Sequence, residues 1–191
     1  MIYLDNAATT FKKPINVIEA INHALTSYGN SGRGAYRAAL DSGRMVYETR
    51  EKISKFFGSS DPSKVIFTSN ATEGLNIVLF GLFCSGNHVI STVTEHNSVL
   101  RPLYKLEKTK NIGIDFIGID ESGKLKYDEF EKHIKENTKA IIVNHVSNVS
   151  GEIADLEYIG KTARKNNLYF IVDVSQSAGN IKIDMNKTGI D

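Results

Sequence analysis

Short apolar runs rich in β-branched residues alternate with helical segments along most of this sequence. We expect the runs to form strands at 65–68, 88–91, 114–117, 140–143 and 168–172, and the segments between them to form helices at 72–83, 98–108, 127–136 and 156–165. Such alternation favours right-handed crossovers. Strands that are apolar throughout are expected where helices cover both faces. The sequence therefore predicts an α/β fold with a mainly parallel sheet and helices on both faces.

The first part of the chain, before residue 65, contains expected helices but no expected strand. Pro14 suits the first turn of a helix, and Ile18, Ile21 and Leu25 follow at helical spacing. A glycine-rich loop at 29–35 leads to a second expected helix at 37–57. Gly29, Gly32 and Gly34 lack the spacing of a dinucleotide-binding loop and follow a helix, so a nucleotide-binding Rossmann protein is only a weak alternative.

Composition narrows the class of protein. A formal net charge of +1 over 191 residues gives no general attraction to nucleic acid or anionic membrane. The single cysteine, Cys84, allows no intramolecular disulfide and is expected in the core at the apolar end of a helix. The N-terminus has no signal-peptide pattern, and the longest apolar stretch is too short to span a bilayer. We expect a soluble cytoplasmic protein with no membrane or nucleic-acid partner.

Polar clusters follow four of the expected strands, at 68–74, 94–98, 144–151 and 173–176. Ligands of open α/β sheets bind at the carboxyl ends of strands, so four clusters at one edge suggest a common site. The first cluster runs into a helix, where free N–H groups favour an anion; a helix cap with nothing bound is the alternative. None of the other histidines shows metal-ligand spacing with His96, so no zinc site is expected.

Three further side chains in these clusters are candidates, each with a plainer alternative. The flat ring of His96 suits stacking on a planar ligand; the plainer alternative is that His96 is an ordinary surface histidine. Asp173 ends an apolar strand, where a carboxylate needs a partner; it either meets a ligand, with Gln176 nearby, or caps the next turn. Asn148 offers amide donors or simply forms a turn.

These segments together resemble the class V aminotransferases, most closely their cysteine desulfurase-like branch. The resemblance covers essentially the whole chain, and the matching segments are 3–10, Lys13-Pro14, Arg33-Gly34, 67–76, 95–102, 147–151 and 172–176. It implies the large domain of fold type I, a homodimer and the cofactor pyridoxal 5′-phosphate. By resemblance Ala71 and Thr72 hold the phosphate, His96 stacks on the ring, and Asp173 pairs with the ring nitrogen. Gln176 bonds the phenolic oxygen, and Asn148 approaches the cofactor or the substrate carboxylate.

The sequence departs from the family pattern at two points. Ser175 stands where the family more often has alanine. The family's Schiff-base lysine and, in desulfurases, the reactive cysteine are expected beyond Asp191. Residues 1–191 are therefore interpreted as the N-terminal part of the cofactor-binding domain, without the rest of that domain or the small C-terminal domain. No catalytic residue is assigned within the chain, which alone is expected to be inactive.

The resemblance implies an enzyme of the desulfurase type, which converts L-cysteine to alanine and passes sulfur to an enzyme cysteine and then to a possible acceptor protein. Alternatives that keep the cofactor are selenocysteine lyase, transaminase and epimerase activity. A different class of alternative is a non-catalytic phosphate-binding module.

Overall fold

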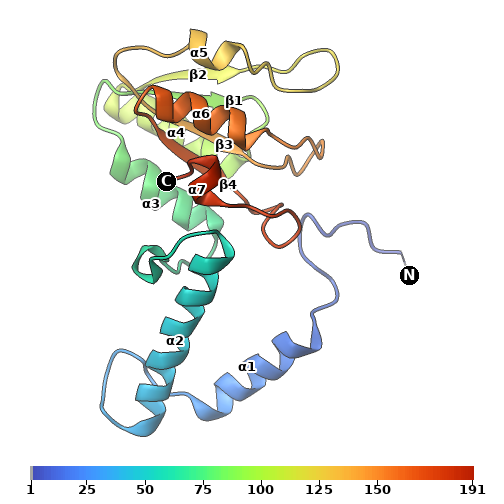
Figure 1. Ribbon diagram of the computed structural model, residues 1–191, viewed down its shortest axis with the longest axis vertical. Coiled ribbons are helices and arrows are strands. Elements are labelled where there is room, and N and C mark those ends of the chain that lie inside the picture. The colour runs from blue at the N-terminus through green and yellow to red at the C-terminus, as the bar shows by residue number, and fades with distance from the viewer. Residues whose placement is uncertain (1) are drawn as a thin grey trace. The chain divides into compact units, whose positions relative to one another are not determined.

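The computed structural model describes residues 2–191, which form two compact units divided between Val65 and Ile66 (Figure 1). The first unit holds α1 (Ile15–Ser27), α2 (Arg37–Phe56) and a short 3-10 helix, η1 (Pro62–Lys64). Helix α1 has no buried residue. The buried hydroxyl of Ser42 on α2 donates to the carbonyl of Gly29 at 2.8 Å, which ties the glycine-rich loop to that helix.

The second unit contains a four-stranded sheet with the strand order β2-β1-β3-β4, and every pairing is parallel. The strands are β1 (His88–Thr92), β2 (Gly113–Ile117), β3 (Thr138–Asn144) and β4 (Tyr169–Asp173). The helices are α3 (Ala71–Leu82), α4 (Asn97–Lys110), α5 (Glu129–Lys132), α6 (Leu156–Lys165) and α7 (Met185–Thr188). The predicted α/β fold with a parallel sheet is confirmed.

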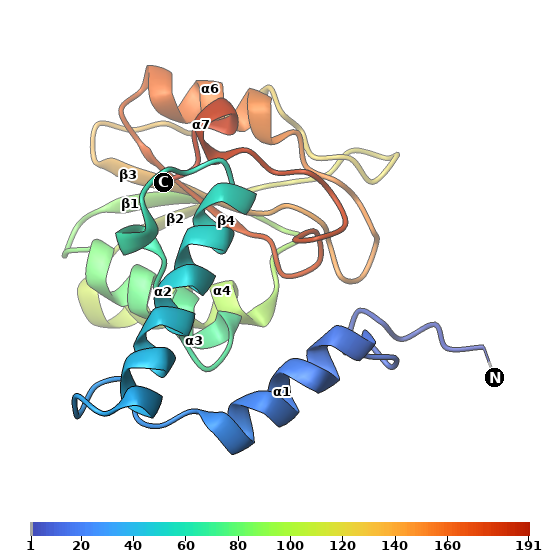
Figure 2. The ribbon, with the colours of Figure 1, turned by 60° about the horizontal axis from the view of Figure 1, so that its bottom comes forward.

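Helices cover both faces of this sheet, with α3 and α4 on one side and α6 on the other (Figure 2). Neighbouring strand residues point to opposite faces, so Val89 packs in the cluster with α3 and α4, whereas Ile90 packs in the cluster with α5 and α6. The central strands β1 and β3 are almost wholly buried, and the outer strands are partly exposed. This burial explains the uninterrupted apolar runs in the sequence.

Three local expectations are wrong. Residues 65–68 do not join the sheet, and Ile66 is 70% exposed, because the sheet ends at β2 and β4 without taking in this segment. The helix expected at 127–136 has only four residues, since the backbone N–H of Lys135 donates to the Thr138 hydroxyl instead of continuing a helix. Cys84 is exposed, because α3 ends two residues earlier and the buried position goes to Phe83.

Candidate functional site

The polar residues that follow β1, β3 and β4 meet at one edge of the sheet. Asn144 at the end of β3 lies in register with Asp173 at the end of β4. The side-chain amide of Asn144 donates to the carbonyl of Thr94 at 2.9 Å, and its backbone N–H donates to Oε1 of Glu95 at 2.9 Å. The loop after β1 is thereby fastened to the end of β3, beside Asp173.

Asp173 is the last residue of β4 and is partly buried. Its Oδ1 accepts from the backbone N–H of Ser175 at 2.9 Å and from the Ser175 hydroxyl at 2.5 Å. The side chain therefore does cap the next turn, as one interpretation of the sequence held. Both of these bonds use Oδ1, and a carboxylate has further acceptor positions, so the side chain can also accept from a cationic group placed at the strand ends.

His96 is the N-cap of α4, directly after Glu95. Its Nδ1 accepts from the backbone N–H of Ser98 at 3.2 Å and lies 2.9 Å from the Ser98 hydroxyl. These bonds fix one edge of the imidazole ring of an exposed residue. A ring held in this way suits stacking on a planar ligand, since stacking adds no demand on its nitrogen atoms.

Ala71 and Thr72 form the first turn of α3, and both are exposed. The N-cap side chain of Asn70 accepts from the backbone N–H of Glu73 at 2.9 Å, and the Glu73 carboxylate accepts from the N–H of Ser69 at 2.6 Å. This arrangement resembles a capping box, except that the Glu73 carboxylate reaches the N–H of Ser69 instead of that of the N-cap residue Asn70. It leaves the N–H groups of Ala71 and Thr72 directed out of the helix end, where the helix dipole favours an anion.

Asn148 and Gln176 lie in the loops after β3 and β4. The loop at 147–151 is shaped by the buried hydroxyl of Ser147, which accepts from the N–H groups of Val149 and Ser150 at 3.3 Å each, and it leaves Asn148 exposed. Gln176 is partly buried in the turn after Asp173. All six predicted site residues belong to the second unit. Asn144 lies in register with Asp173, and its hydrogen bonds hold Thr94 and Glu95, the two residues that precede His96.

Sequence reasoning missed the role of Glu95, although it quoted the segment that contains it. The side chain is only 7% exposed, and Oε1 also accepts from the Thr92 hydroxyl at 2.7 Å. Burial raises the pKa of Glu95 to about 7, hydrogen bonds from Thr92 and Asn144 oppose the rise, and the nearby negative charge of Asp173 adds to it. The sequence shows only a carboxylate in the polar loop after an apolar run, which does not distinguish a buried side chain from an exposed one.

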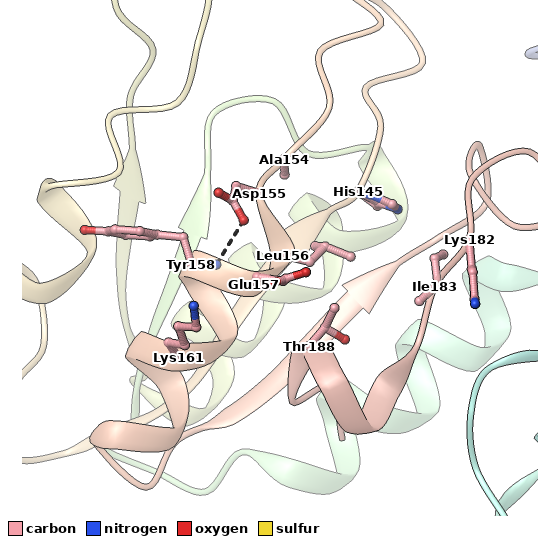
Figure 3. Close-up of a pocket in the computed structure, with 10 residues that line it drawn as sticks. All are labelled: His145, Ala154, Asp155, Leu156, Glu157, Tyr158, Lys161, Lys182, Ile183 and Thr188. Carbon is pink, nitrogen blue, oxygen red and sulfur yellow. Dashed lines mark hydrogen bonds between the residues drawn. The ribbon is translucent and has the colours of Figure 1, made fainter.

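A separate open cavity of about 490 Å³ lies beside α6 and α7 (Figure 3). Its lining includes Lys161, Lys182 and buried His145, but none of the six predicted site residues. We therefore place the candidate site at the strand ends. Within residues 2–191, no cluster of three or more histidine, cysteine, aspartate or glutamate side chains is arranged to hold a metal ion, and no helix is long and apolar enough to cross a membrane.

Comparison with known proteins gives a consistent result. A probable cysteine desulfurase of Borreliella burgdorferi is 38% identical over all of this chain and 46% of its own length. The apo structure of a cysteine desulfurase from Thermococcus onnurineus NA1 matches with a TM-score of 0.93 and 34% identity, over all of this chain and 48% of that one. SspA, solved in complex with cysteine, matches with a TM-score of 0.90 and 28% identity, over 99% and 55% of the two chains.

The chain thus spans about half the length of the curated relatives it matches. The family model for class V aminotransferases matches residues 2–191, nearly the whole sequence. Since sequence, relatives and fold agree, this chain belongs to the class V aminotransferase family.

Proposed function

We propose that the chain binds pyridoxal 5′-phosphate at the strand ends of its second unit and contributes this site to an enzyme of the cysteine desulfurase type. The observation that carries the proposal is the linked set of Asp173, Asn144, Glu95 and His96, which places an ionisable carboxylate and a fixed aromatic ring at one edge of a parallel sheet. The names of the relatives support the reaction, and SspA in complex with cysteine supports the substrate.

The residues present fit this cofactor. The free N–H groups of Ala71 and Thr72 are suited to its phosphate, and the carboxylate of Asp173 is suited to a protonated ring nitrogen. The imidazole of the exposed residue His96 is suited to stacking against the ring. Gln176, in the turn after Asp173, supplies an amide for the phenolic oxygen, and Asn148 supplies one for a carboxylate.

Bound pyridoxal phosphate supplies an electron sink for negative charge at the α-carbon of an amino acid. Asp173 serves that chemistry by keeping the ring nitrogen protonated, and His96 by holding the plane of the ring. We further propose that the substrate is L-cysteine, that the intact enzyme works as a homodimer, and that sulfur passes from an enzyme cysteine to an acceptor protein. Residues 1–191 then form the N-terminal part of its cofactor-binding domain.

The test is binding of 4′-deoxypyridoxine 5′-phosphate, which lacks the aldehyde and so cannot label surface lysines. We expect saturable one-to-one binding by calorimetry. Asp173→Asn should weaken it about 10- to 100-fold, because a charge-assisted hydrogen bond contributes roughly 1.5–3 kcal/mol. Asp128→Asn, which removes an exposed carboxylate before α5, is the control and should bind like the wild type. Equal affinity of all three proteins would contradict the proposal.

For the substrate, we expect L-cysteine to change the absorption spectrum of the pyridoxal phosphate-loaded enzyme and to yield sulfide under reducing conditions. L-Serine, which has oxygen in place of sulfur, is the matched comparison and should release no sulfide. Spectral change with cysteine but no sulfide would argue for a transaminase or epimerase in place of a desulfurase.

A further inference from the structure

A buried carboxyl oxygen at the end of β1 lacks a partner. Glu95 uses Oε1 for both of its hydrogen bonds, from the Thr92 hydroxyl and from the backbone N–H of Asn144. Oε2 is fully buried and has no hydrogen-bond partner within the described part of the chain. A buried unsatisfied carboxylate oxygen is costly, roughly 1–3 kcal/mol or more when charged, so its retention needs an explanation.

The position of Glu95 connects the two halves of the candidate site. On one side it directly precedes His96, the N-cap of α4. On the other side it holds the backbone of Asn144, which lies in register with Asp173. Thr94 reinforces this link, since its carbonyl accepts from the side chain of Asn144. The Glu95 carboxyl and the Thr94 carbonyl together therefore tie the loop that carries His96 to the end of β3, beside Asp173 on β4.

The charges around Glu95 make its protonation depend on Asp173. The ionisable groups on the adjoining elements are Asp173 on β4, His96 at the start of α4 and His145 after β3. Burial lowers the pKa of His145, which favours its neutral form. Asp173 is negatively charged and raises the pKa of Glu95, in addition to the larger effect of burial. A cation placed beside Asp173 would offset that negative charge and favour ionised Glu95.

We propose that Glu95 is a positioning residue of the cofactor site, which holds the His96 loop against the strand ends and releases a proton to water when a cationic ring binds beside Asp173. The inference rests on the proposed cofactor site and deepens it. In the protonated fraction of Glu95 we place the proton on Oε2, the oxygen that accepts no hydrogen bond, and Asp173 is then the only charged carboxylate of the pair. Because binding releases a proton, the affinity of the site for the ring then depends on pH.

Two substitutions separate the roles of Glu95. Glu95→Gln keeps the shape and an oxygen acceptor for Thr92 and Asn144 but cannot release a proton. Glu95→Ala removes the acceptor as well, so it leaves the N–H of Asn144 unsatisfied and holds the His96 loop only through the bond from Asn144 to the Thr94 carbonyl. Asp128→Asn is again the control, because it changes an exposed carboxylate before α5.

The measurement is calorimetric titration with 4′-deoxypyridoxine 5′-phosphate in two buffers of different ionisation enthalpy, which counts the protons released. The ligand's own protonation changes are common to all variants and cancel in the difference. We expect the wild type to release up to about half a proton more than Glu95→Gln at pH 7, and up to one proton more well below pH 7. Its affinity should also rise more steeply with pH, by up to tenfold per unit below pH 7. Glu95→Ala should bind more weakly at every pH. Equal proton counts in wild type and Glu95→Gln, or unchanged affinity in Glu95→Ala, would overturn the inference.

A second measurement needs no ligand and separates this inference from the proposed function. In protein labelled with ¹³C-glutamate, the carboxyl resonance that Glu95→Gln removes should titrate near pH 7, and Asp173→Asn should shift that midpoint downward. If the ligand fails to bind, the cofactor proposal fails, yet this titration still decides whether Glu95 and Asp173 are linked. A midpoint near the ordinary glutamate value of about 4.3, or one that Asp173→Asn leaves unchanged, would refute the linkage.

Discussion

Replacing Gly160 by alanine should destabilise the second unit, although alanine is the better helix former. Gly160 lies within α6, against α7. An added Cβ would collide with the carbonyl oxygen of Thr188 and come within 2.9 Å of its carbonyl carbon. Both atoms are backbone, so α7 must move away.

The magnitude follows from two opposing terms. Alanine in place of a helical glycine stabilises by about 1 kcal/mol. Overpacking against backbone costs roughly 1–3 kcal/mol. Moving α7 also threatens the two hydrogen bonds from Arg164 to the carbonyls of Asn186 and Lys187, at about 0.5–1.5 kcal/mol each. If both bonds are lost, these contributions sum to a net loss of about 1–5 kcal/mol in the free energy of unfolding.

Gly81→Ala is the matched control, because a Cβ on Gly81 of α3 meets no atom within 4 Å. This variant should be neutral or stabilised by up to about 1 kcal/mol. The assay is urea unfolding followed by far-ultraviolet circular dichroism. If Gly160→Ala unfolds at the same urea concentration as Gly81→Ala, the close packing of α6 and α7 is refuted.

Three further substitutions test phosphate binding at the N-terminus of α3 and an ion-pair network around Asp115. Asn70→Ala removes the N-cap of α3, so it should lower the free energy of unfolding by about 1 kcal/mol and also weaken phosphate binding. Asp184→Ala is the control: it removes the N-cap of α7 and should lower the free energy of unfolding by a similar amount without affecting ligand binding. Equal ligand affinity in these two variants would argue against phosphate binding at the N-terminus of α3. Burial acts to raise the pKa of Asp115, but hydrogen bonds from Lys135 and His133 outweigh it and lower that pKa to about 2. The stabilising effect is therefore present above about pH 4 and lost as the pH falls toward 2, so Asp115→Asn should lose about 1–2 kcal/mol at pH 7 and flatten the acid limb of thermal unfolding curves. An acid limb that is the same in Asp115→Asn and the wild type would refute this role of Asp115.

The sequence predicted the sheet because four of its five apolar runs are buried by helices on both faces, and such burial leaves a local signature. The strand predicted at 65–68 is wrong because a strand forms only when a neighbouring strand pairs with it. The sequence does not show where such a neighbour lies. The helix expected at 127–136 is short because the backbone of Lys135 bonds the nearby Thr138 hydroxyl, and its side chain pairs with Asp115 on another strand. Both features depend on tertiary structure that periodicity does not report.

The candidate site, too, could be predicted only in part from the sequence. His96 and Asp173 were identified from their places after strands and from the family resemblance, and the structure links them through Asn144. Glu95 was not assigned a role, because its importance comes from burial and from bonds to residues about fifty positions away. A single sequence does not reveal whether a carboxylate after a strand faces water or the core.

The most direct test of the cofactor site is a crystal structure of the protein with 4′-deoxypyridoxine 5′-phosphate. We predict the phosphate at the N–H groups of Ala71 and Thr72, the ring nitrogen at about 3 Å from a carboxylate oxygen of Asp173, and the ring of His96 stacked on the pyridine. A ligand bound elsewhere, or one bound with its ring nitrogen turned away from Asp173, would contradict the account.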